Sequence, residues 1–311
     1  TSLLDALAAG IGAFFIGLEE INAREVRYDD IRQKFFKHGG IVNYEHQIPV
    51  TVRCQGVLND KPFDWSLMRY SPRGGTDRQG AKRLIVHSKL LGEEVRGGKE
   101  AVLPLIAHYR TGRLWRSEDS DDSDHKSSRF EGYENCLAAP ASDGRMFRNW
   151  WKAHELISLQ EKETPQLKAV RKAVISVIPD AEKIRYDFNY RDLIISFSNG
   201  EICSFFSLSD GYRGMLAMVA DIAVRAATLN PFFEENALTE TPGIVLVDEL
   251  DLHLHPKWQR QIVSDLRSVF PKIQFVTTTH AQQILVGAKS GEISLLRRDE
   301  ETHEICVFRQ E

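Results

Sequence analysis

The sequence predicts an α/β protein whose mostly parallel sheet is flanked by helices. Two apolar runs, at residues 243–249 and 273–280, are continuous enough for strands that are buried on both faces. Helical periodicity over residues 256–270 separates them, and a short helix is expected at 281–288. Strands and helices that alternate in this way are typical of parallel strands covered by helices. A third strand is expected at 292–299.

Two further regions are expected to surround this sheet. Residues 47–56 and 61–71 alternate with strand periodicity and predict an antiparallel β subdomain. Residues 143–162 and 165–178 have helical periodicity, which predicts two helices of an inserted arm. A polar, acidic stretch at 116–129 separates the two regions and is expected to be a surface loop.

These patterns divide the chain into three parts. An N-terminal lobe is expected over residues 1–115, the acidic loop with the helical insertion over 116–182, and a C-terminal lobe over 183–311. Within the C-terminal lobe, strand periodicity with an Asn199-Gly200 turn precedes a long helix at 212–230.

The composition restricts the class of protein. The chain has 311 residues, 42% of them hydrophobic and 27% charged, as expected for a globular protein with a sizeable core. A net charge of −4 argues against a uniformly basic nucleic-acid binder. No apolar run is long enough to cross a bilayer, and the four cysteines form no C-x-x-C pair. We therefore expect a reduced, cytoplasmic protein that does not associate with a membrane.

Two acidic residues follow the first apolar strand. Asp248 and Glu249 would emerge at the carboxyl end of that strand, where open α/β sheets bind ligands. An apolar strand that ends in two acids is also typical of ATPases. There the first acid holds Mg²⁺ and the second activates the water that attacks the γ-phosphate. The alternative is a strand that simply ends in two solvated acids.

Two other sites could contribute to phosphate binding. His280 ends the next strand, where it could hydrogen-bond a γ-phosphate, although a lone histidine is more often a surface or core residue. Ser209, Asp210 and Gly211 precede the long helix, whose free N–H groups could bind a phosphate. The same three residues are also ordinary for the start of a capped helix.

In this order the three motifs resemble those of a known family. SLSDG, VLVDELDLHLHP and TTTH are similar to the signature, the Walker B strand with its D-loop, and the switch histidine of ABC-type ATPases. The closest likeness is to the RecF/SMC-like group, often called AAA-family ATPases. Within that group, LPLIAHYRTGRLW, GYENCL and SDGYRGMLAMVADIAVRAATLNP resemble the ATPases of Septu-type and retron-linked antiphage defence systems. The resemblance implies an ABC-type ATPase head that uses ATP and Mg²⁺.

The resemblance also implies roles for individual residues. Asp248 would be the Mg²⁺-side acid, Glu249 the catalytic base and His280 the γ-phosphate switch. Ser209 and Gly211 would form the signature, which contacts the ATP bound by a second protomer.

The sequence departs from the family pattern at two of these motifs. Asp210 replaces the usual first glycine of the signature and adds a negative charge near a phosphate. His255 replaces the D-loop aspartate.

Thr1 opens a predicted buried helix. A P-loop has the pattern G-x-x-x-x-G-K-[ST], and its last residue leads directly into a helix. We expect Thr1 to be that residue, with its hydroxyl on Mg²⁺ and the glycines and lysine upstream. The alternative is a threonine that only caps the helix.

The expected function is that of an ATP-dependent switch. Two chains, or a higher oligomer, would enclose ATP head to tail, and hydrolysis would control an effector, expected to be an HNH nuclease. A retron reverse transcriptase complex or a nucleic acid are further expected partners. Two alternatives remain open: a DNA-repair or nucleic-acid-sensing ATPase with slow turnover, and the motor subunit of a transporter.

Two more patterns have competing interpretations. RNWWK, at residues 148–152, could stack single-stranded nucleic acid, but helical tryptophans are usually buried. His253 and His255 could hold Zn²⁺, but no further ligands at suitable spacing complete a site, so a D-loop and helix-cap segment is favoured.

Overall fold

A computed structural model shows how these segments are arranged. It describes residues 2–19, 21–38, 41–112, 128–138, 144–289, 291–300 and 305–309. Thr1 and nearly all of the acidic loop, two features that the sequence analysis singles out, lie outside the described residues.

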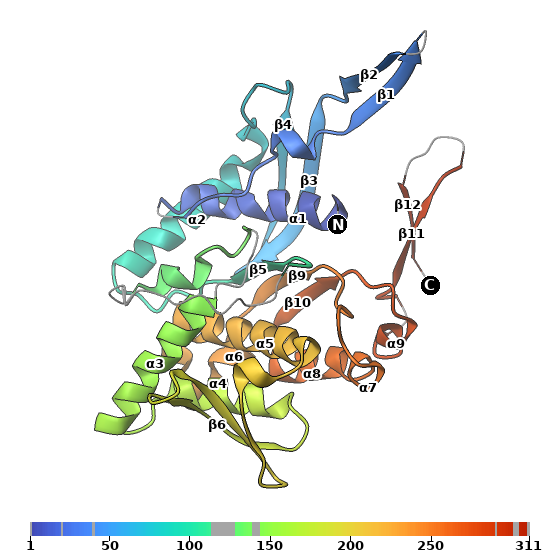
Figure 1. The fold of residues 1–311 in the computed structure, drawn as a ribbon. Coiled ribbons are helices and arrows are strands. Elements are labelled where there is room, and N and C mark those ends of the chain that lie inside the picture. Colours follow the sequence, from blue (N-terminus) through green and yellow to red (C-terminus); the bar gives the residue numbers. More distant parts are fainter. Residues whose placement is uncertain are drawn as a thin grey trace.

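A parallel sheet of three strands lies at the centre of the fold (Figure 1). Its strands are β5 (Leu105–Tyr109), β9 (Gly243–Val247) and β10 (Ile273–Thr277), in the order β10-β9-β5. The register pairs Tyr109 with Val247 and Val247 with Thr277, so all three strands end at the same edge. This confirms the two predicted strands and places the first of them in the centre.

Helices cover both faces of this sheet. Figure 1 shows α1 (Ser2–Gly12) above the sheet and α5 (Asp210–Leu229) below it. After its first residues, α5 is buried almost all round, because it packs against the sheet and against further helices. No helix in the described part of the chain is long and apolar enough to span a membrane.

An antiparallel β subdomain adjoins α1, as predicted. Strands β3 (Val50–Leu58) and β4 (Lys61–Arg69) form a hairpin, and α2 (Lys82–Arg96) packs on β4. The indole N–H of Trp65 donates to the carbonyl of Gly10 at 2.8 Å and anchors the hairpin to α1. A second, smaller core forms here from apolar residues: Ala9, Ala13, Val26, Phe63, Leu67, Ala81 and Leu84.

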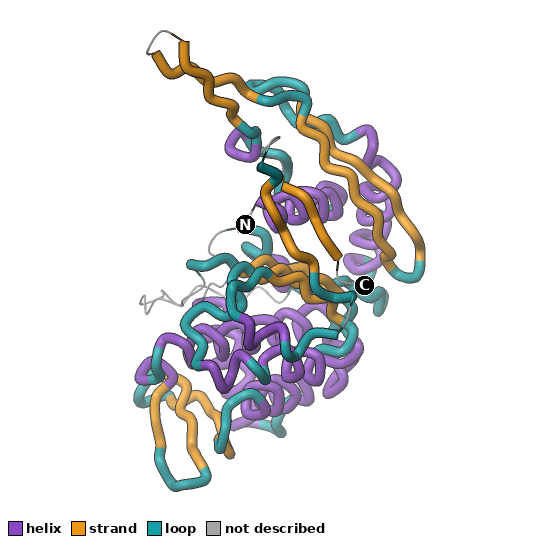
Figure 2. Tube along the Cα trace, turned by 90° about the vertical axis from the view of Figure 1, so that its right-hand side faces the viewer, coloured by secondary structure: helices purple, strands orange, loops and turns teal. Residues whose placement is uncertain are grey.

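The structure contains a second N-terminal hairpin that the sequence analysis does not predict. It consists of β1 (Gln33–His38) and β2 (Ile41–His46), which pair antiparallel and extend away from the body (Figures 1 and 2).

The two helices expected between residues 143 and 178 are present as α3 (Gly144–Gln160) and α4 (Pro165–Ser176). They pack against α5 and share its core. Trp150 and Trp151 of RNWWK are buried in this core, with exposed fractions of 7% and 0%, and do not form a stacking surface.

An antiparallel sheet follows α4. It contains β6 (Ala181–Asp187), β7 (Asp192–Phe197) and β8 (Ile202–Ser204) in that order. The turn between β7 and β8 needs a glycine, because Gly200 has φ of +83°, a value that side chains disfavour. The predicted turn at Asn199-Gly200 is confirmed.

The C-terminal elements differ from the prediction in two places. Residues 256–270 form two helices, α7 (Pro256–Gln259) and α8 (Ile262–Val269), instead of one. The helix is interrupted at Gln261, because its N–H donates to the carbonyl of Trp258, three residues back, and not to the carbonyl four residues back.

The predicted third strand exists as β11 (Ser294–Arg298) but does not join the parallel sheet. It pairs antiparallel with β12 (Ile305–Arg309). A hairpin partner only a few residues along the chain is reached without the long crossover that parallel pairing needs. Among the described residues, two further short α-helices are α6 (Ala237–Glu240) and α9 (Gln282–Leu285).

A buried ion pair joins α5 to the sheet. Arg225 Nε donates to Asp221 Oδ2 at 2.8 Å, and both side chains are 1% exposed. The hydroxyl of Tyr109, the last residue of β5, donates to the same carboxylate oxygen at 2.6 Å. Arg225 also donates to the carbonyls of Gly132 and Glu134, at 2.9 and 3.0 Å. The pair therefore fixes the end of β5, and the segment beside it, to α5.

Replacing Arg225 by methionine should lower the free energy of unfolding by about 3–5 kcal/mol, because Asp221 would stay buried without its cation. Urea unfolding of the wild type and the variant measures this difference. The double variant Asp221→Leu, Arg225→Met removes both charges and should recover part of the loss. A loss below about 1 kcal/mol for the single variant would contradict the structural role given to the pair.

Candidate active site

Asp248 lies at the carboxyl edge of the parallel sheet, directly after β9. Its backbone N–H donates to the carbonyl of Tyr109 at 2.8 Å, which extends the β5–β9 pairing by one residue. Asp248 is 3% exposed, whereas Glu249 is only half-buried and has φ of +49°. The turn at Glu249 thus takes the chain out of the sheet and leaves the two carboxylates in different environments.

Thr278 connects the two acidic residues. Its hydroxyl donates to Asp248 Oδ1 at 2.6 Å and accepts from the backbone N–H of Glu249 at 2.9 Å. Sequence reasoning missed this residue, although a hydroxyl directly after a strand that neighbours the acidic one was a usable signal. The side chain that accepts from Thr278 is a buried carboxylate. Carboxylate oxygens are ligands that Mg²⁺ prefers, so this donor fits the metal that the motif implies.

His280 lies near this arrangement. The chain segments after β9 and β10 run side by side, since Thr278 N–H bonds to the Val247 carbonyl and Leu250 N–H bonds to the Thr278 carbonyl, at 3.0 and 2.9 Å. His280 follows Thr278 by two residues and is exposed. The structure therefore brings Asp248, Glu249 and His280 to one edge of the sheet.

The first turn of α1 lies at the same edge. Asp5 in this turn accepts a hydrogen bond from Arg110, which directly follows β5. Oδ1 of Asp5 also lies 3.6 Å from the guanidinium Nη2 of Arg24. Thr1 itself is outside the described residues, so its predicted place on the metal is not tested.

His108 is a buried histidine beneath this edge. It lies in β5 opposite Leu246 and is 1% exposed, and its Nδ1 has no hydrogen-bond partner in the described part of the chain. Burial, and then the charge of Arg110, lower the pKa of His108 from 6.5 to about 4, although Asp5 and Asp248 partly oppose the shift. His108 is therefore neutral at pH 7.

The residues that are expected to form the signature lie at the start of α5. Ser209 is exposed and its side chain makes no hydrogen bond to the first turn, so it does not act as an ordinary side-chain cap. Asp210 forms an ion pair with Arg213, which offsets the negative charge at this helix start.

Gly211 is buried for a packing reason. A Cβ at this position would lie 2.1 Å from the carbonyl oxygen of His253, too close for any real contact. The start of α5 therefore touches the backbone of the loop after β9 within one chain. The structure brings Gly211 to this loop, where it is covered.

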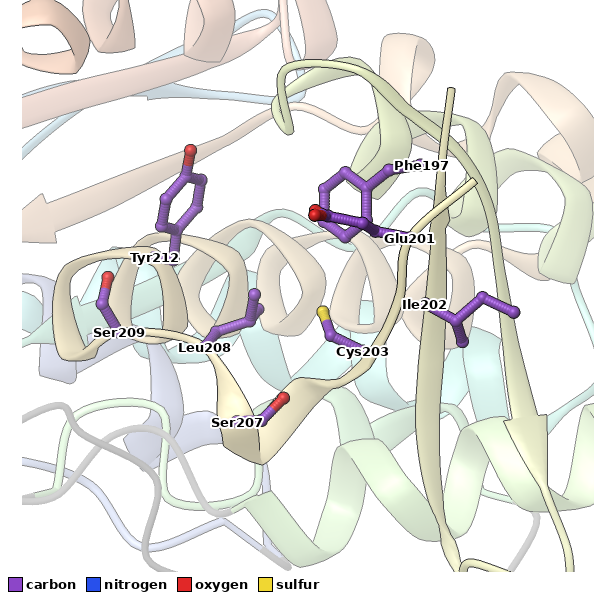
Figure 3. Close-up of a pocket in the computed structure, with 8 residues that line it drawn as sticks. All are labelled: Phe197, Glu201, Ile202, Cys203, Ser207, Leu208, Ser209 and Tyr212. Carbon is purple, nitrogen blue, oxygen red and sulfur yellow. The ribbon is translucent and has the colours of Figure 1, made fainter. Parts of the chain in front are cut away.

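Ser209 lines a surface hollow that is separate from the two acidic residues. The hollow is open and lies between the β7–β8 hairpin and the start of α5 (Figure 3). Its lining residues are Phe197, Glu201, Ile202, Cys203, Ser207, Leu208, Ser209 and Tyr212. Asp248, Glu249 and His280 do not line it, so the structure does not join the signature to the carboxylates within one chain.

His255 caps the following helix. Its Nδ1 accepts from the backbone N–H of Lys257 at 3.3 Å, at the start of α7. Among the described residues, no three histidine, cysteine or acidic side chains lie close enough to hold a metal ion together. The contact supports a helix cap rather than a zinc ligand.

The fold is similar to that of SMC ATPase heads. Among solved structures, an "SmcHead bound to the C-winged helix domain of ScpA" matches 99% of this chain and 87% of its own with a TM-score of 0.54. The two sequences are only 11% identical, so this likeness concerns the fold alone.

The chain belongs to the family described as "AAA domain, putative AbiEii toxin, Type IV TA system", whose model matches residues 1–285. This confirms the family that the sequence motifs indicate.

Curated relatives add detail. The chain is 38% identical over 131 residues to "Retron Vc95 probable ATPase" of Vibrio cholerae serotype O1 biovar El Tor. It is 37% identical over 146 residues to "Septu protein PtuA" of Bacillus mycoides (strain KBAB4), and 31% identical over 169 residues to the protein of the same name from Bacillus thuringiensis. These matches cover 42%, 47% and 50% of this chain but 25%, 19% and 40% of the relatives. The matches thus span less than half the length of each relative.

Replacing Thr278 by valine keeps the side-chain shape but removes the hydroxyl between Asp248 and Glu249. The free energy of unfolding should fall by about 1–3 kcal/mol, because a buried carboxylate oxygen and a backbone N–H lose their partner. Chemical denaturation measures the change. Thr278→Ser keeps the hydroxyl and serves as the matched control. Equal losses in the two variants would mean that the hydrogen bonds contribute nothing.

His108 should make stability pH-dependent. The unfolded chain takes up the proton near pH 6.5 and the folded chain only near pH 4. Between these values the unfolded state binds more protons, so stability falls as the pH falls, by about 3 kcal/mol in total. Urea unfolding at pH 7 and at pH 4.5 should show most of this loss in the wild type and a smaller loss in His108→Gln. Identical pH dependence in the two proteins would contradict the inferred environment of His108.

Proposed function

We propose that the chain forms the nucleotide-binding part of an ATP-hydrolysing switch protein of antiphage defence. The observation that carries the proposal is the arrangement of Asp248, Thr278 and Glu249 at the carboxyl edge of β9 and β10. Acidic residues at that position of a parallel sheet suit a nucleotide with its metal ion. The names of the curated relatives support the same activity and biological setting.

Asp248 and Glu249 have different roles in this proposal. Asp248 is buried and hydrogen-bonded through Oδ1, which keeps it oriented to hold Mg²⁺, directly or through water. Mg²⁺ supplies charge stabilisation at the phosphates when it is bound. Glu249 is less buried and accepts a proton from the attacking water. His280 donates a hydrogen bond to the γ-phosphate, and Thr1 adds a hydroxyl ligand for the metal.

The open edge of β10 supports a place for the phosphate-binding loop. In the described part of the chain no strand pairs with β10 on the side away from β9, and Phe275 and Val276 are only half-buried. A strand that leads into a P-loop and then into α1 would cover this edge. A structure of the full-length protein that showed the P-loop strand elsewhere in the sheet would contradict this placement.

The exposed start of α5 supports a head-to-tail dimer. Ser209 and the free N–H groups of this 20-residue helix can bind the phosphates of an ATP held by a second protomer. Because Gly211 has no side chain, the start of α5 can pack against the loop after β9. A change in this loop when ATP binds would therefore alter the position of the signature in the same chain. Hydrolysis would reopen the dimer and change the activity of an effector, which we propose is an HNH nuclease.

Glu249→Gln should trap the ATP-bound dimer. The substitution removes the base but keeps the size of the side chain, so ATP binds and is not hydrolysed. We expect hydrolysis to fall by at least about a hundredfold and the full-length protein to form an ATP-dependent dimer or higher oligomer. Light scattering after gel filtration, with and without ATP, measures the change in mass.

Glu182→Gln, on the exposed face of β6, is the matched control and should behave as the wild type. If Glu249→Gln binds ATP but its mass is unchanged, the dimer model fails. If Glu249→Gln hydrolyses ATP at the wild-type rate, Glu249 is not the base.

A further inference from the structure

The β1–β2 hairpin carries an unusual surface for a ribbon that extends away from the body (Figures 1 and 2). Phe35 and Tyr44 are 63% and 50% exposed, and Ile41 and Val42 are 67% and 62% exposed. A lone two-stranded ribbon is only marginally stable in water, and this one displays its apolar side chains there. Such a surface is better suited to a ligand than to solvent.

Four rings form a continuous row on this ribbon. Tyr28, just before β1, lies 5.0 Å from His46 between ring centroids, and His46 lies 5.5 Å from Tyr44. Tyr44 is directly opposite Phe35 in the register, with their rings 6.0 Å apart. We call Tyr28, His46, Tyr44 and Phe35 the ring row. It runs from the base of the hairpin toward its outer half.

Basic side chains accompany the ring row. Lys37 follows Phe35 by two residues and therefore lies on the same face of the strand. On the opposite face, the ammonium of Lys34 lies 5.5 Å from the ring centroid of Phe36. From residue 32 to residue 46 the chain has three basic residues and one acidic residue, whereas the whole chain has a net charge of −4. The two strands are thus locally positive, whereas Asp29 and Asp30 adjoin Tyr28 at the base of the ring row.

We propose that the ring row binds single-stranded nucleic acid. Bases would stack on the exposed rings of Phe35, Tyr44 and Tyr28, and Lys37, on the same face, would contact the phosphates. Successive rings along a basic track are the arrangement that single strands use, because every base has a face that can stack. In a duplex the bases are already stacked on each other and do not reach such rings. The inference does not rest on the ATP site, which involves other elements.

The basic residues distinguish this ligand from a protein partner. Lysine is depleted in the buried cores of protein interfaces, but it is well placed beside a phosphate backbone. The cross-strand ring pair also stabilises the hairpin itself. Hairpin stability explains why Phe35 lies opposite Tyr44. It does not explain why the ring contacts continue through His46 to Tyr28, which lies outside the strands.

The test uses the full-length protein and a fluorescent 20-nucleotide oligothymidine. Fluorescence anisotropy at low salt should show binding to the single strand that is at least tenfold tighter than to a duplex of equal length. The double variant Phe35→Ala, Tyr44→Ala should weaken binding at least about tenfold, in line with stacking on two rings. Lys37→Gln should weaken it less and reduce its dependence on salt.

Two matched variants keep the test specific. Phe35→Tyr, Tyr44→Phe retains both rings and should bind as the wild type does. Tyr190→Ala removes a ring that is 76% exposed on the turn between β6 and β7, and should also leave binding unchanged. Circular dichroism checks that the alanine variant is folded. If it is not, Tyr28→Ala, which lies outside the hairpin strands, replaces it, with a smaller expected loss because one ring is removed instead of two.

Three results would overturn the proposal. The first is that the oligonucleotide does not bind to the wild type. The second is equal binding to the wild type and to the folded ring variants. The third is a protein partner that is lost on ring removal while oligonucleotide binding is unchanged, which would make the ribbon a protein-docking element.

Discussion

The buried carboxylate of Asp221 is the constraint on which the arrangement of the central sheet depends. It accepts hydrogen bonds from Arg225 on its own helix and from the hydroxyl of Tyr109 at the end of β5. Burial alone would disfavour both charges, but Asp221 raises the pKa of Arg225, and Tyr109 has a pKa well above its usual value because it is buried beside the carboxylate. Arg225 therefore stays protonated, and Tyr109 keeps its hydroxyl proton, across the physiological range.

This contact continues into the candidate active site. The backbone carbonyl of Tyr109 accepts from Asp248 N–H, and the side chain of Asp248 accepts from Thr278. A chain of hydrogen bonds thus leads from Arg225 in α5 to the acid proposed to hold Mg²⁺. The same helix begins at Ser209 and Gly211, and Gly211 packs against the backbone of the loop that follows Asp248 and Glu249.

The sequence predicted the elements whose pattern is local. The buried strand before Asp248 and Glu249, the β3–β4 hairpin and the turn at Gly200 are specified by apolar runs, strand alternation and turn residues. Contacts between distant segments were not accessible in the same way. Thr278 hydrogen-bonds the side chain of Asp248, although the two residues are 30 positions apart in the sequence. The GYENCL segment is held by a hydrogen bond from Arg225, which lies far along the chain. The rings of the β1–β2 hairpin were missed because no alternation of polar and apolar residues marks a ribbon that is exposed on both faces.

The most direct test of the account is whether Asp248 binds the metal of Mg·ATP. Isothermal titration calorimetry of the full-length protein would measure ATP affinity with Mg²⁺ and with EDTA, for the wild type and Asp248→Asn. The account predicts that Mg²⁺ tightens ATP binding in the wild type by at least about tenfold and has little effect in the variant. An equal gain from Mg²⁺ in both proteins would contradict the assignment of this edge of the sheet as the nucleotide site.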